Sequence, residues 1–306
     1  MSKFQAWLYA FRLRTLPLAL SSIIVGSSIA YADVKAGFSW LIFGLCVLTT
    51  LFLQVLSNLA NDYGDSEKGT DNDDRIGPKR AVQSGLLSFA EIKLGIYVCG
   101  ALALASGLIL VYKATQGLNI NYTIFFIVLG LCAMAAAVKY TMGKNAYGYQ
   151  GLGDLFVLLF FGIVGVCGSH YLIAHKLHYS VLLPAFTIGA FSTGVLNLNN
   201  MRDHTSDEKA GKITMVVRMG LPNAMRYHRI LILAGFAASI IFVIANFTST
   251  MQFLFLITVP LFRRHLVAVR RVNHHQEFDP LLPQLAIGTF IFSILFALGM
   301  IIGSVG

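Results

Sequence analysis

Two polar clusters with the same spacing interrupt an otherwise apolar chain. They read Asn58-x-x-Asn61-x-x-x-Asp65 and Asn200-x-x-Asp203-x-x-x-Asp207. Residues at i, i+3 and i+7 share one face of a helix, so each cluster presents its carboxylate and carboxamide oxygens together. Hard oxygen donors suit Mg²⁺, which usually completes its coordination with waters and substrate phosphate oxygens. The spacing therefore predicts two facing acidic helix ends that bind Mg²⁺ and, through it, a diphosphate.

Basic residues accompany both clusters. Arg202 stands beside Asp203, Lys212 follows the second cluster, and the segment DRIGPKRAVQSG (74–85) follows the first. The glycines and proline of that segment allow it to fold back over the acids. Arginine binds phosphate as a fork and lysine as a point charge. Either set of cations could instead be basic residues of the membrane surface that set topology. The candidate phosphate-binding cations are Arg202, Lys212, Arg75, Lys79 and Arg80.

Two further groups of residues have a plausible chemical role. In Tyr140-x-x-x-Lys144 the two side chains share a helix face, so Lys144 could reach a phosphate while Tyr140 lines the place where a carbocation forms. The alternative is an interfacial Tyr/Lys anchor. Arg12 and Arg14 precede the first apolar run and could bind an anionic acceptor, or could simply signal topology.

Composition identifies an integral membrane protein. The 306 residues are 56% hydrophobic and 12% charged, whereas soluble domains carry about a quarter charged residues. A spanning helix needs about 20 apolar residues. We expect an all-α, polytopic fold with a single domain over 1–306 and helices around a central cavity. The nine predicted spans are 16–32, 39–60, 90–112, 120–140, 153–174, 179–198, 229–247, 250–268 and 282–303, with Arg263 and Arg264 shortening the eighth.

The basic residues predict the orientation of these spans. With the N-terminus in the cytoplasm, only Lys35, Lys113 and Lys176 of the 23 basic residues fall on the other side, as the positive-inside rule requires. The net charge of +9 then reports topology, and we expect no nucleic-acid partner and no protein partner. The four cysteines lie scattered in apolar spans without metal or redox spacing.

The arrangement of the clusters indicates an internal repeat. They follow the second and sixth predicted spans, on the same side of the membrane, and nine of the 14 acidic residues lie in the segments 61–86 and 199–222. Acidic residues near a bilayer are costly and tend to mark function. We expect each half of the chain to contribute one cluster to a shared site.

Taken together, these motifs resemble the UbiA superfamily of intramembrane prenyltransferases. That superfamily has an NDxxDxxxD motif after helix two, YxxxK after helix four and DxxxD after helix six, and the resemblance covers essentially the whole chain. Here Gly69 stands where the first motif would end in Asp, and the next acid is Asp71. The stretches SNLANDYGDSEKGTD, GYQGLGDLFVLLFFG and NNMRD, with Asp154 in the second, look like the branch that prenylates 1,4-dihydroxy-2-naphthoate in the menaquinone pathway.

The resemblance implies a reaction and a location. The reaction is Mg²⁺-dependent transfer of a polyprenyl group from polyprenyl diphosphate to 1,4-dihydroxy-2-naphthoate, with loss of CO₂ and diphosphate, to give demethylmenaquinol. The location is the bacterial cytoplasmic (inner) membrane, with the site facing the cytoplasm. The implied metal ligands are Asn61, Asp62, Asp65, Asp71, Asp203 and Asp207. The implied catalytic residues are Asp65, Asp203, Asp207, Lys144 and Tyr140, and the substrate-binding candidates also include Arg12, Arg14, Asn58 and Asn200.

Two alternatives stay open at this point. One is a prenyltransferase of the same fold that acts on another aromatic acceptor, such as 4-hydroxybenzoate or homogentisate. The other is an ion-coupled transporter with paired acidic sites. Transporter sites usually lie near the bilayer midplane on broken helices. The acids of this chain instead follow long apolar runs and neighbour basic residues.

Overall fold

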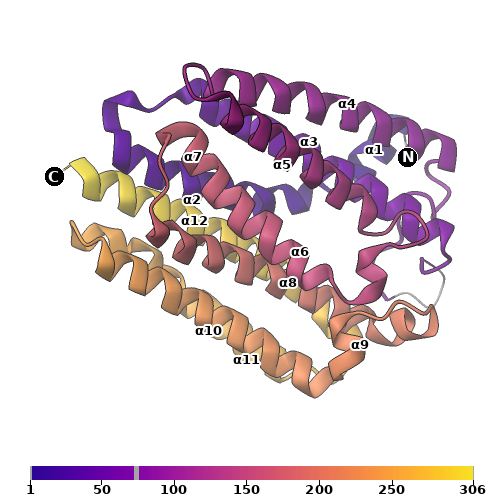
Figure 1. The fold of residues 1–306 in the computed structure, drawn as a ribbon. Helices are drawn as coiled ribbons and strands as arrows, with labels where there is room; N and C mark the ends of the chain where they lie inside the picture. The colour runs from indigo at the N-terminus through magenta and orange to yellow at the C-terminus, as the bar shows by residue number, and fades with distance from the viewer. Residues whose placement is uncertain (1, 72–75, 306) are drawn as a thin grey trace.

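The computed structural model describes residues 2–71 and 76–305, and in these residues the fold is helical without strands (Figure 1). Nine segments of the described chain are long and apolar enough to cross a membrane. Each overlaps one of the predicted spans, so the all-α, nine-span prediction is confirmed. The segments are Lys3–Gly37, Trp40–Glu67, Phe89–Ala114, Ile120–Lys139, Gly153–Ala174, Tyr179–Lys209, Leu221–Ala245, Thr250–Arg270 and His275–Ser304.

Several of these segments contain more than one element. The first segment contains α1 (Lys3–Phe11), η1 (Leu13–Thr15), α2 (Leu16–Val34) and η2 (Lys35–Gly37). The fifth segment contains α6 (Gly153–Val157), the π-helix η4 (Leu158–Cys167) and α7 (Gly168–Ala174). The eighth segment contains η6 (Thr250–Thr258) and α11 (Val259–Arg270). The remaining spans are α3 (Trp40–Glu67), α4 (Phe89–Ala114), α5 (Ile120–Lys139), η5 with α8 (Tyr179–Val181, Leu182–Lys209), α10 (Leu221–Ala245) and η7 with α12 (His275–Phe278, Leu281–Val305). Two short elements, η3 (Tyr147–Gln150) and α9 (Met215–Met219), lie between spans.

The break after α1 places one arginine at the interior of the bundle. Arg12 has φ 50°, in the left-handed region, so the helix ends there and a new one starts at Leu16 with Pro17 in its first turn. Proline is well tolerated at that position, because its missing N–H would have no partner in the first turn. Ser2 and Gln5 form a capping box that fixes the start of α1.

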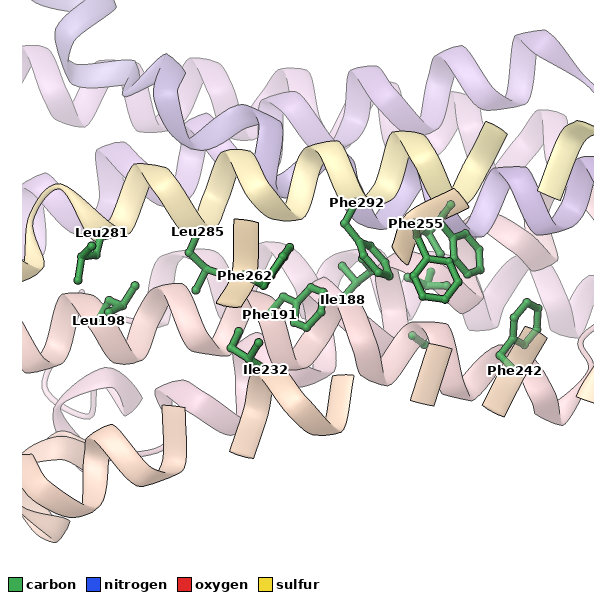
Figure 2. Packing of buried hydrophobic residues seen from close by; sticks show 14 of the residues in the cluster. Ile188, Phe191, Leu198, Ile232, Phe242, Phe255, Phe262, Leu281, Leu285 and Phe292 are labelled. Atoms are coloured by element: carbon green, nitrogen blue, oxygen red, sulfur yellow. The ribbon is translucent and has the colours of Figure 1, made fainter. Parts of the chain in front are cut away.

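Aromatic packing around α8 forms the largest apolar core (Figure 2). Phe191 of α8 packs against Phe262 of α11 and Phe292 of α12, with ring centroids 4.9 and 5.2 Å apart. Phe255 of η6 packs on Phe292 at 5.2 Å. Tilted and edge-to-face aromatic pairs at this spacing are favourable beyond the area they bury. The core therefore holds α8, and with it the second polar cluster, in a fixed place.

Small residues let η4 lie directly against α8 on its other side. A Cβ built on Gly162 would come within 2.5 Å of the Ala185 carbonyl, and one on Gly189 within 2.8 Å of the Leu158 carbonyl. Glycine is used in membrane helices where two backbones must approach this closely. The contact fixes one wall of the cavity described below.

The two polar clusters end in the same backbone geometry. Gly69 and Gly211 have φ 69° and 71°, in the left-handed region where only glycine avoids a Cβ penalty. In each helix the N–H of the residue after this glycine donates to the carbonyl of the last cluster aspartate, Asp65 at 2.9 Å in α3 and Asp207 at 2.8 Å in α8. Both helices also extend past the predicted limits of 60 and 198, so each cluster is wholly helical.

Candidate active site

The two polar clusters meet at one buried lysine. Lys212 Nζ lies 3.8 Å from Asp65 Oδ2 and 3.6 Å from Asp207 Oδ1, and all three side chains are buried. Burial by itself lowers the pKa of the Lys212 ammonium, but the two carboxylates outweigh it and raise the pKa above the ordinary value of lysine. The ends of α3 and α8 therefore share one charged site.

Arg80 brings the loop after α3 into this site. Its guanidinium lies 2.8 Å from Asp65 Oδ2 and 3.0 Å from Asp71 Oδ2, and Nη1 donates to the Asn61 carbonyl. Burial opposes the charge of Arg80, but these carboxylates raise its pKa above the ordinary arginine value. The described part of the loop, 76–85, thus folds back over the acids, as its glycines and proline predict.

Asp62 holds the same loop through the backbone. Its carboxylate oxygens accept hydrogen bonds from the N–H groups of Ala81 at 3.0 Å and Val82 at 3.3 Å. Asp62 is buried and does not line the central cavity. The contact makes Asp62 a support for Arg80, one residue before Ala81 in the chain.

Arg202 is also buried, and its guanidinium is held by groups of the protein. Nε and Nη2 donate to the two Asp203 carboxylate oxygens at 2.8 and 2.6 Å, Nη1 donates to Asp279 at 2.6 Å, and Nη2 donates to Asn199 Oδ1 at 2.9 Å. A Cβ built on Gly77 would lie 2.5 Å from Nη2. The returning loop therefore lies directly against Arg202.

Tyr149 is a site residue that the spacing of the motifs did not reveal. Its hydroxyl donates to Asp65 Oδ1 at 2.8 Å and lies 2.6 Å from Thr70 Oγ1. Lys68 and Lys212 lie 4.2 and 5.4 Å from its ring centroid. Burial and the Asp65 charge raise the pKa of the phenol, so it stays a hydrogen-bond donor. The only sequence signal was its place in the segment GYQGLGD that carries the branch resemblance.

A cavity of about 450 Å³ extends from this charged site into the membrane-spanning region. Asn61, Asp65, Arg80 and Lys212 line its polar part. Its apolar wall comes from α2, α3, α4, α5 and the segment of α6, η4 and α7, and includes Cys46, Leu110, Phe126 and Leu172. The site thus combines a charged head with an apolar tunnel, which suits an amphiphile with an anionic head and a hydrocarbon tail.

Four aromatic rings line the cavity in succession from the charged head. Tyr140 and Tyr147 have ring centroids 5.3 Å apart, Tyr147 stacks on Phe156 at 4.0 Å, and Phe156 stacks on Phe160 at 6.1 Å. Burial raises the pKa of both tyrosines, with nearby carboxylates adding to the effect at Tyr140, so both rings stay neutral. Neutral aromatic faces can stabilise a cation and stack on a flat aromatic acceptor.

The other predicted site residues fall into three groups. Arg12 and Asn58 line the cavity, and Asn58 donates to the Phe11 carbonyl and Thr15 Oγ1, both at 2.9 Å, which ties α3 to the helix break. Asp71, Asn200, Asp203 and Asp207 are buried near the charged head but do not line the cavity. Lys144, Lys79 and Arg14 are exposed and not brought to the cavity, and Arg75 lies outside the described residues.

The chemistry of the donors fits Mg²⁺, and several of the carboxylates also pair with cations of the protein. Within residues 2–71 and 76–305, no three His, Cys, Asp or Glu side chains gather at metal-ligand distances. Arg80, Lys212 and Arg202 each pair with carboxylates that a metal would otherwise share. The donors at the charged head are nevertheless oxygens, and the buried Asn200 Oδ1 receives no hydrogen bond from any described residue. An all-oxygen donor set of this kind matches Mg²⁺ completed by substrate phosphates.

Comparison with known proteins gives concordant matches. Residues 19–279 match the UbiA prenyltransferase family. A 1,4-dihydroxy-2-naphthoate octaprenyltransferase of Haemophilus influenzae is 41% identical over 98% of this chain and 97% of its own length. A protein of the same name from Escherichia coli is 41% identical over 98% of this chain and 96% of its own length.

Solved structures share the fold. A UbiA homologue from Archaeoglobus fulgidus bound to GPP and Mg²⁺ has a TM-score of 0.69 at 15% identity, covering 97% of this chain and 99% of that one. The apo structure of a UbiA homologue from Aeropyrum pernix K1 has a TM-score of 0.67 at 15% identity, covering 92% and 99%.

Proposed function

Because the chain belongs to the UbiA prenyltransferase family, we propose that it transfers a polyprenyl group from polyprenyl diphosphate to 1,4-dihydroxy-2-naphthoate. The products are demethylmenaquinol, CO₂ and diphosphate. The observation that carries the proposal is the meeting of Asp65 and Asp207 at Lys212, at the charged head of an apolar cavity. The naphthoate acceptor rests on the names of relatives that align over nearly their whole length.

Mg²⁺ would bind at the charged head through Asn61, Asp65, Asp203 and Asp207. Bound Mg²⁺ would neutralise negative charge on the diphosphate leaving group. The cations of the chain have a complementary part. Lys212 and Arg80 line the cavity beside Asp65, so they are placed to bind diphosphate oxygens directly. A likeness to a neighbour bound to GPP and Mg²⁺ supports this use of the site.

The bond changes follow from this placement. The allylic carbon–oxygen bond breaks as the diphosphate leaves with the electron pair, and charge-stabilising groups fixed in a dry site lower the barrier. Tyr140, Tyr147 and Phe156 present ring faces to the allylic cation and exclude water from it. The acceptor ring then forms a carbon–carbon bond at the carbon that carries its carboxylate, and loss of CO₂ restores the aromatic ring.

Several residues take roles different from those implied by their motifs. We assign Asp62 to the support of the Arg80 loop instead of to the metal, since two backbone N–H groups already use its carboxylate. Arg202 holds Asp203 in place. Lys144, which the Tyr140-x-x-x-Lys144 spacing made a candidate phosphate ligand, is exposed, whereas Lys212 keeps the phosphate-binding part predicted for it. Arg12 is placed to bind the acceptor carboxylate, whereas Arg14 and Lys79 are exposed.

We further propose that the whole chain acts as one domain in the bacterial cytoplasmic membrane, with the site facing the cytoplasm. Supporting this orientation, the charged head lies at the ends of α3 and α8 that precede the most basic loops. Proteolysis of sealed vesicles tests it. Cleavage at Arg75 or Lys79 from the cytoplasmic side alone agrees with the proposal, and cleavage only from the other side contradicts it.

The reaction is tested with the purified protein in detergent. It is incubated with Mg²⁺, a polyprenyl diphosphate and 1,4-dihydroxy-2-naphthoate, with 4-hydroxybenzoate in a parallel reaction, and products are identified by mass spectrometry. We expect a prenylated product without the carboxyl mass, from the naphthoate alone. Product from hydroxybenzoate alone would overturn the acceptor, and absence of product from both would overturn the reaction.

A further inference from the structure

Gln54 is a polar residue of the cavity wall that has no part in the bond changes proposed above. It lies on α3 four residues before Asn58 and seven before Asn61, and all three side chains line the cavity. Residues at this spacing share one helix face, so Gln54 continues the face of the first polar cluster one turn deeper into the membrane-spanning region. Apolar residues of the same wall, among them Cys46 and Leu53, surround the cavity at this depth.

Hydrogen bonds to the helix break after α1 fix the orientation of the Gln54 carboxamide. Asn58 Nδ2 donates to the Phe11 carbonyl at 2.9 Å, and because a carbonyl only accepts, the other terminal atom of Asn58 is its oxygen. Gln54 Nε2 donates to that oxygen and to Thr15 Oγ1, both at 3.2 Å. Thr15 Oγ1 spends its own proton on the Arg12 carbonyl at 3.0 Å, so toward Gln54 it accepts. Both N–H bonds of the Gln54 amide are therefore in use.

This network leaves the carbonyl oxygen of Gln54 as an acceptor for a ligand in the cavity. Within residues 2–71 and 76–305 no group donates a hydrogen bond to Oε1, and the atom is not enclosed by protein. Hydroxyls of the same wall, such as that of Thr50, can turn to the carbonyl of the preceding helical turn. The Gln54 carboxamide lacks this freedom, because its two N–H bonds hold it in place. An acceptor without a partner is costly in apolar surroundings, so Oε1 favours an occupant that brings a donor.

Only one part of the proposed substrates carries such a donor. The diphosphate offers acceptor oxygens that bind Mg²⁺ and cations, and the polyprenyl tail has no polar hydrogen. The aromatic acceptor alone brings hydroxyl groups, which donate. The inference rests on the proposed function, in which these are the substrates.

We propose that Gln54 Oε1 accepts a hydrogen bond from the acceptor hydroxyl farthest from the carboxylate, at C4 of 1,4-dihydroxy-2-naphthoate. Arg12, which is placed to bind that carboxylate, joins Asn58 through Thr15, and Gln54 lies one helical turn, about 6 Å, deeper than Asn58. The C1 hydroxyl is next to the carboxylate and stays at its level, whereas the C4 hydroxyl on the far side of the ring extends toward Gln54. Gln54 is then a specificity-determining residue that selects acceptors with a C4 hydroxyl and fixes the ring in the cavity.

Acceptor affinity measured without the prenyl donor tests the proposal. The full chain in detergent is titrated by calorimetry with 1,4-dihydroxy-2-naphthoate and, in parallel, with 1-hydroxy-2-naphthoate, which lacks the C4 hydroxyl. The test variant Gln54→Met keeps the length of the side chain and removes the acceptor oxygen. The matched control Thr50→Val removes a hydroxyl from the same wall one helical turn away. The melting temperature of each variant reports whether the fold is retained, and the comparison of the two ligands on the natural chain needs no variant.

The two ligands separate a direct contact from a structural role of Gln54. The natural chain should bind 1,4-dihydroxy-2-naphthoate about 2- to 12-fold more tightly than 1-hydroxy-2-naphthoate, which is the range for one neutral hydrogen bond. Gln54→Met should bind the two compounds equally, and Thr50→Val should keep the preference. A purely structural role would weaken both ligands alike and leave their ratio unchanged.

The outcomes also distinguish this proposal from the proposed function. Equal affinity of the natural chain for both compounds, or a preference that Gln54→Met retains, would overturn the role of Gln54. Prenyl transfer to 1,4-dihydroxy-2-naphthoate by the natural chain is measured in parallel. If transfer occurs while the two affinities are equal, only the role of Gln54 is overturned. If neither compound binds and no transfer occurs, the proposed acceptor is overturned with it.

Discussion

Replacing Lys212 by Met should remove most of the catalytic activity. Lys212 lies 3.6 Å from Asp207 and 3.8 Å from Asp65, and it lines the cavity where the diphosphate would bind. Asp65 keeps its ion pair with Arg80 at 2.8 Å in the variant, whereas Asp207 loses its ion pair with Lys212. Loss of one fixed electrostatic stabiliser costs about 3 kcal/mol of transition-state stabilisation, which is about 150-fold in rate.

The matched control for this variant is Lys144→Met. Both changes remove one lysine charge on the same side of the membrane, but Lys144 is exposed and outside the cavity. The assay is kcat/KM from diphosphate release at saturating Mg²⁺. We expect Lys144→Met to stay within about threefold of the natural chain. An equal loss in both variants, or activity of Lys212→Met within threefold of the natural chain, would refute the assignment of Lys212.

Three further predictions follow from the same contacts. Tyr149→Phe removes a hydrogen bond to the Asp65 carboxylate worth about 1.5–3 kcal/mol, so kcat/KM should fall about 10- to 150-fold; an unchanged kcat/KM would exclude a positioning role. Asp62→Asn should lower the melting temperature, because the loop loses its charged hydrogen-bond acceptor at a cost of about 1–2 kcal/mol. The Mg²⁺ concentration that gives half-maximal activity should not change. A rise in that concentration would show that Asp62 is a metal ligand after all. The folded-state pKa of Lys212 is raised above the ordinary lysine value of 10.5, so the stability contributed by its ion pairs is fully present below pH 10.5 and is lost only as the pH rises through the folded-state pKa. The difference in melting temperature between the natural chain and Lys212→Met should therefore stay constant between about pH 7 and pH 9.5. Loss of this difference within that pH window would contradict the ion pairs.

The nine spans were predictable because a membrane-spanning helix needs only a local run of apolar residues. Even the eighth, where Arg263 and Arg264 shorten the apolar run, is helical through Arg270, because those two side chains face outward. The meeting of the two polar clusters also followed from local information. Equal spacing at the ends of two helices on one side of the membrane left few other ways to bury so many acids.

The partners within the site were not predictable, because they depend on how separate segments pack. The sequence made both Lys144 and Lys212 candidate phosphate ligands. In the structure the chain after α5 leaves Lys144 exposed, while Lys212 directly follows the glycine turn that ends α8. Asp62 is about 100° from Asn61 around the helix and about 60° from Asp65, so spacing could not tell whether it faces metal or loop. Tyr149 belongs to no periodic pattern, and only the tertiary structure brings its hydroxyl to Asp65.

A double-mutant cycle on Asp65 and Asp207 tests most directly whether the two clusters form one site. The measurement is kcat/KM for Mg²⁺-dependent diphosphate release by Asp65→Asn, Asp207→Asn and the double variant. Residues that act as a unit are not additive, so the double variant should lose little more than the worse single variant, about 3 kcal/mol. Two losses that simply add would contradict the shared site that Lys212 joins.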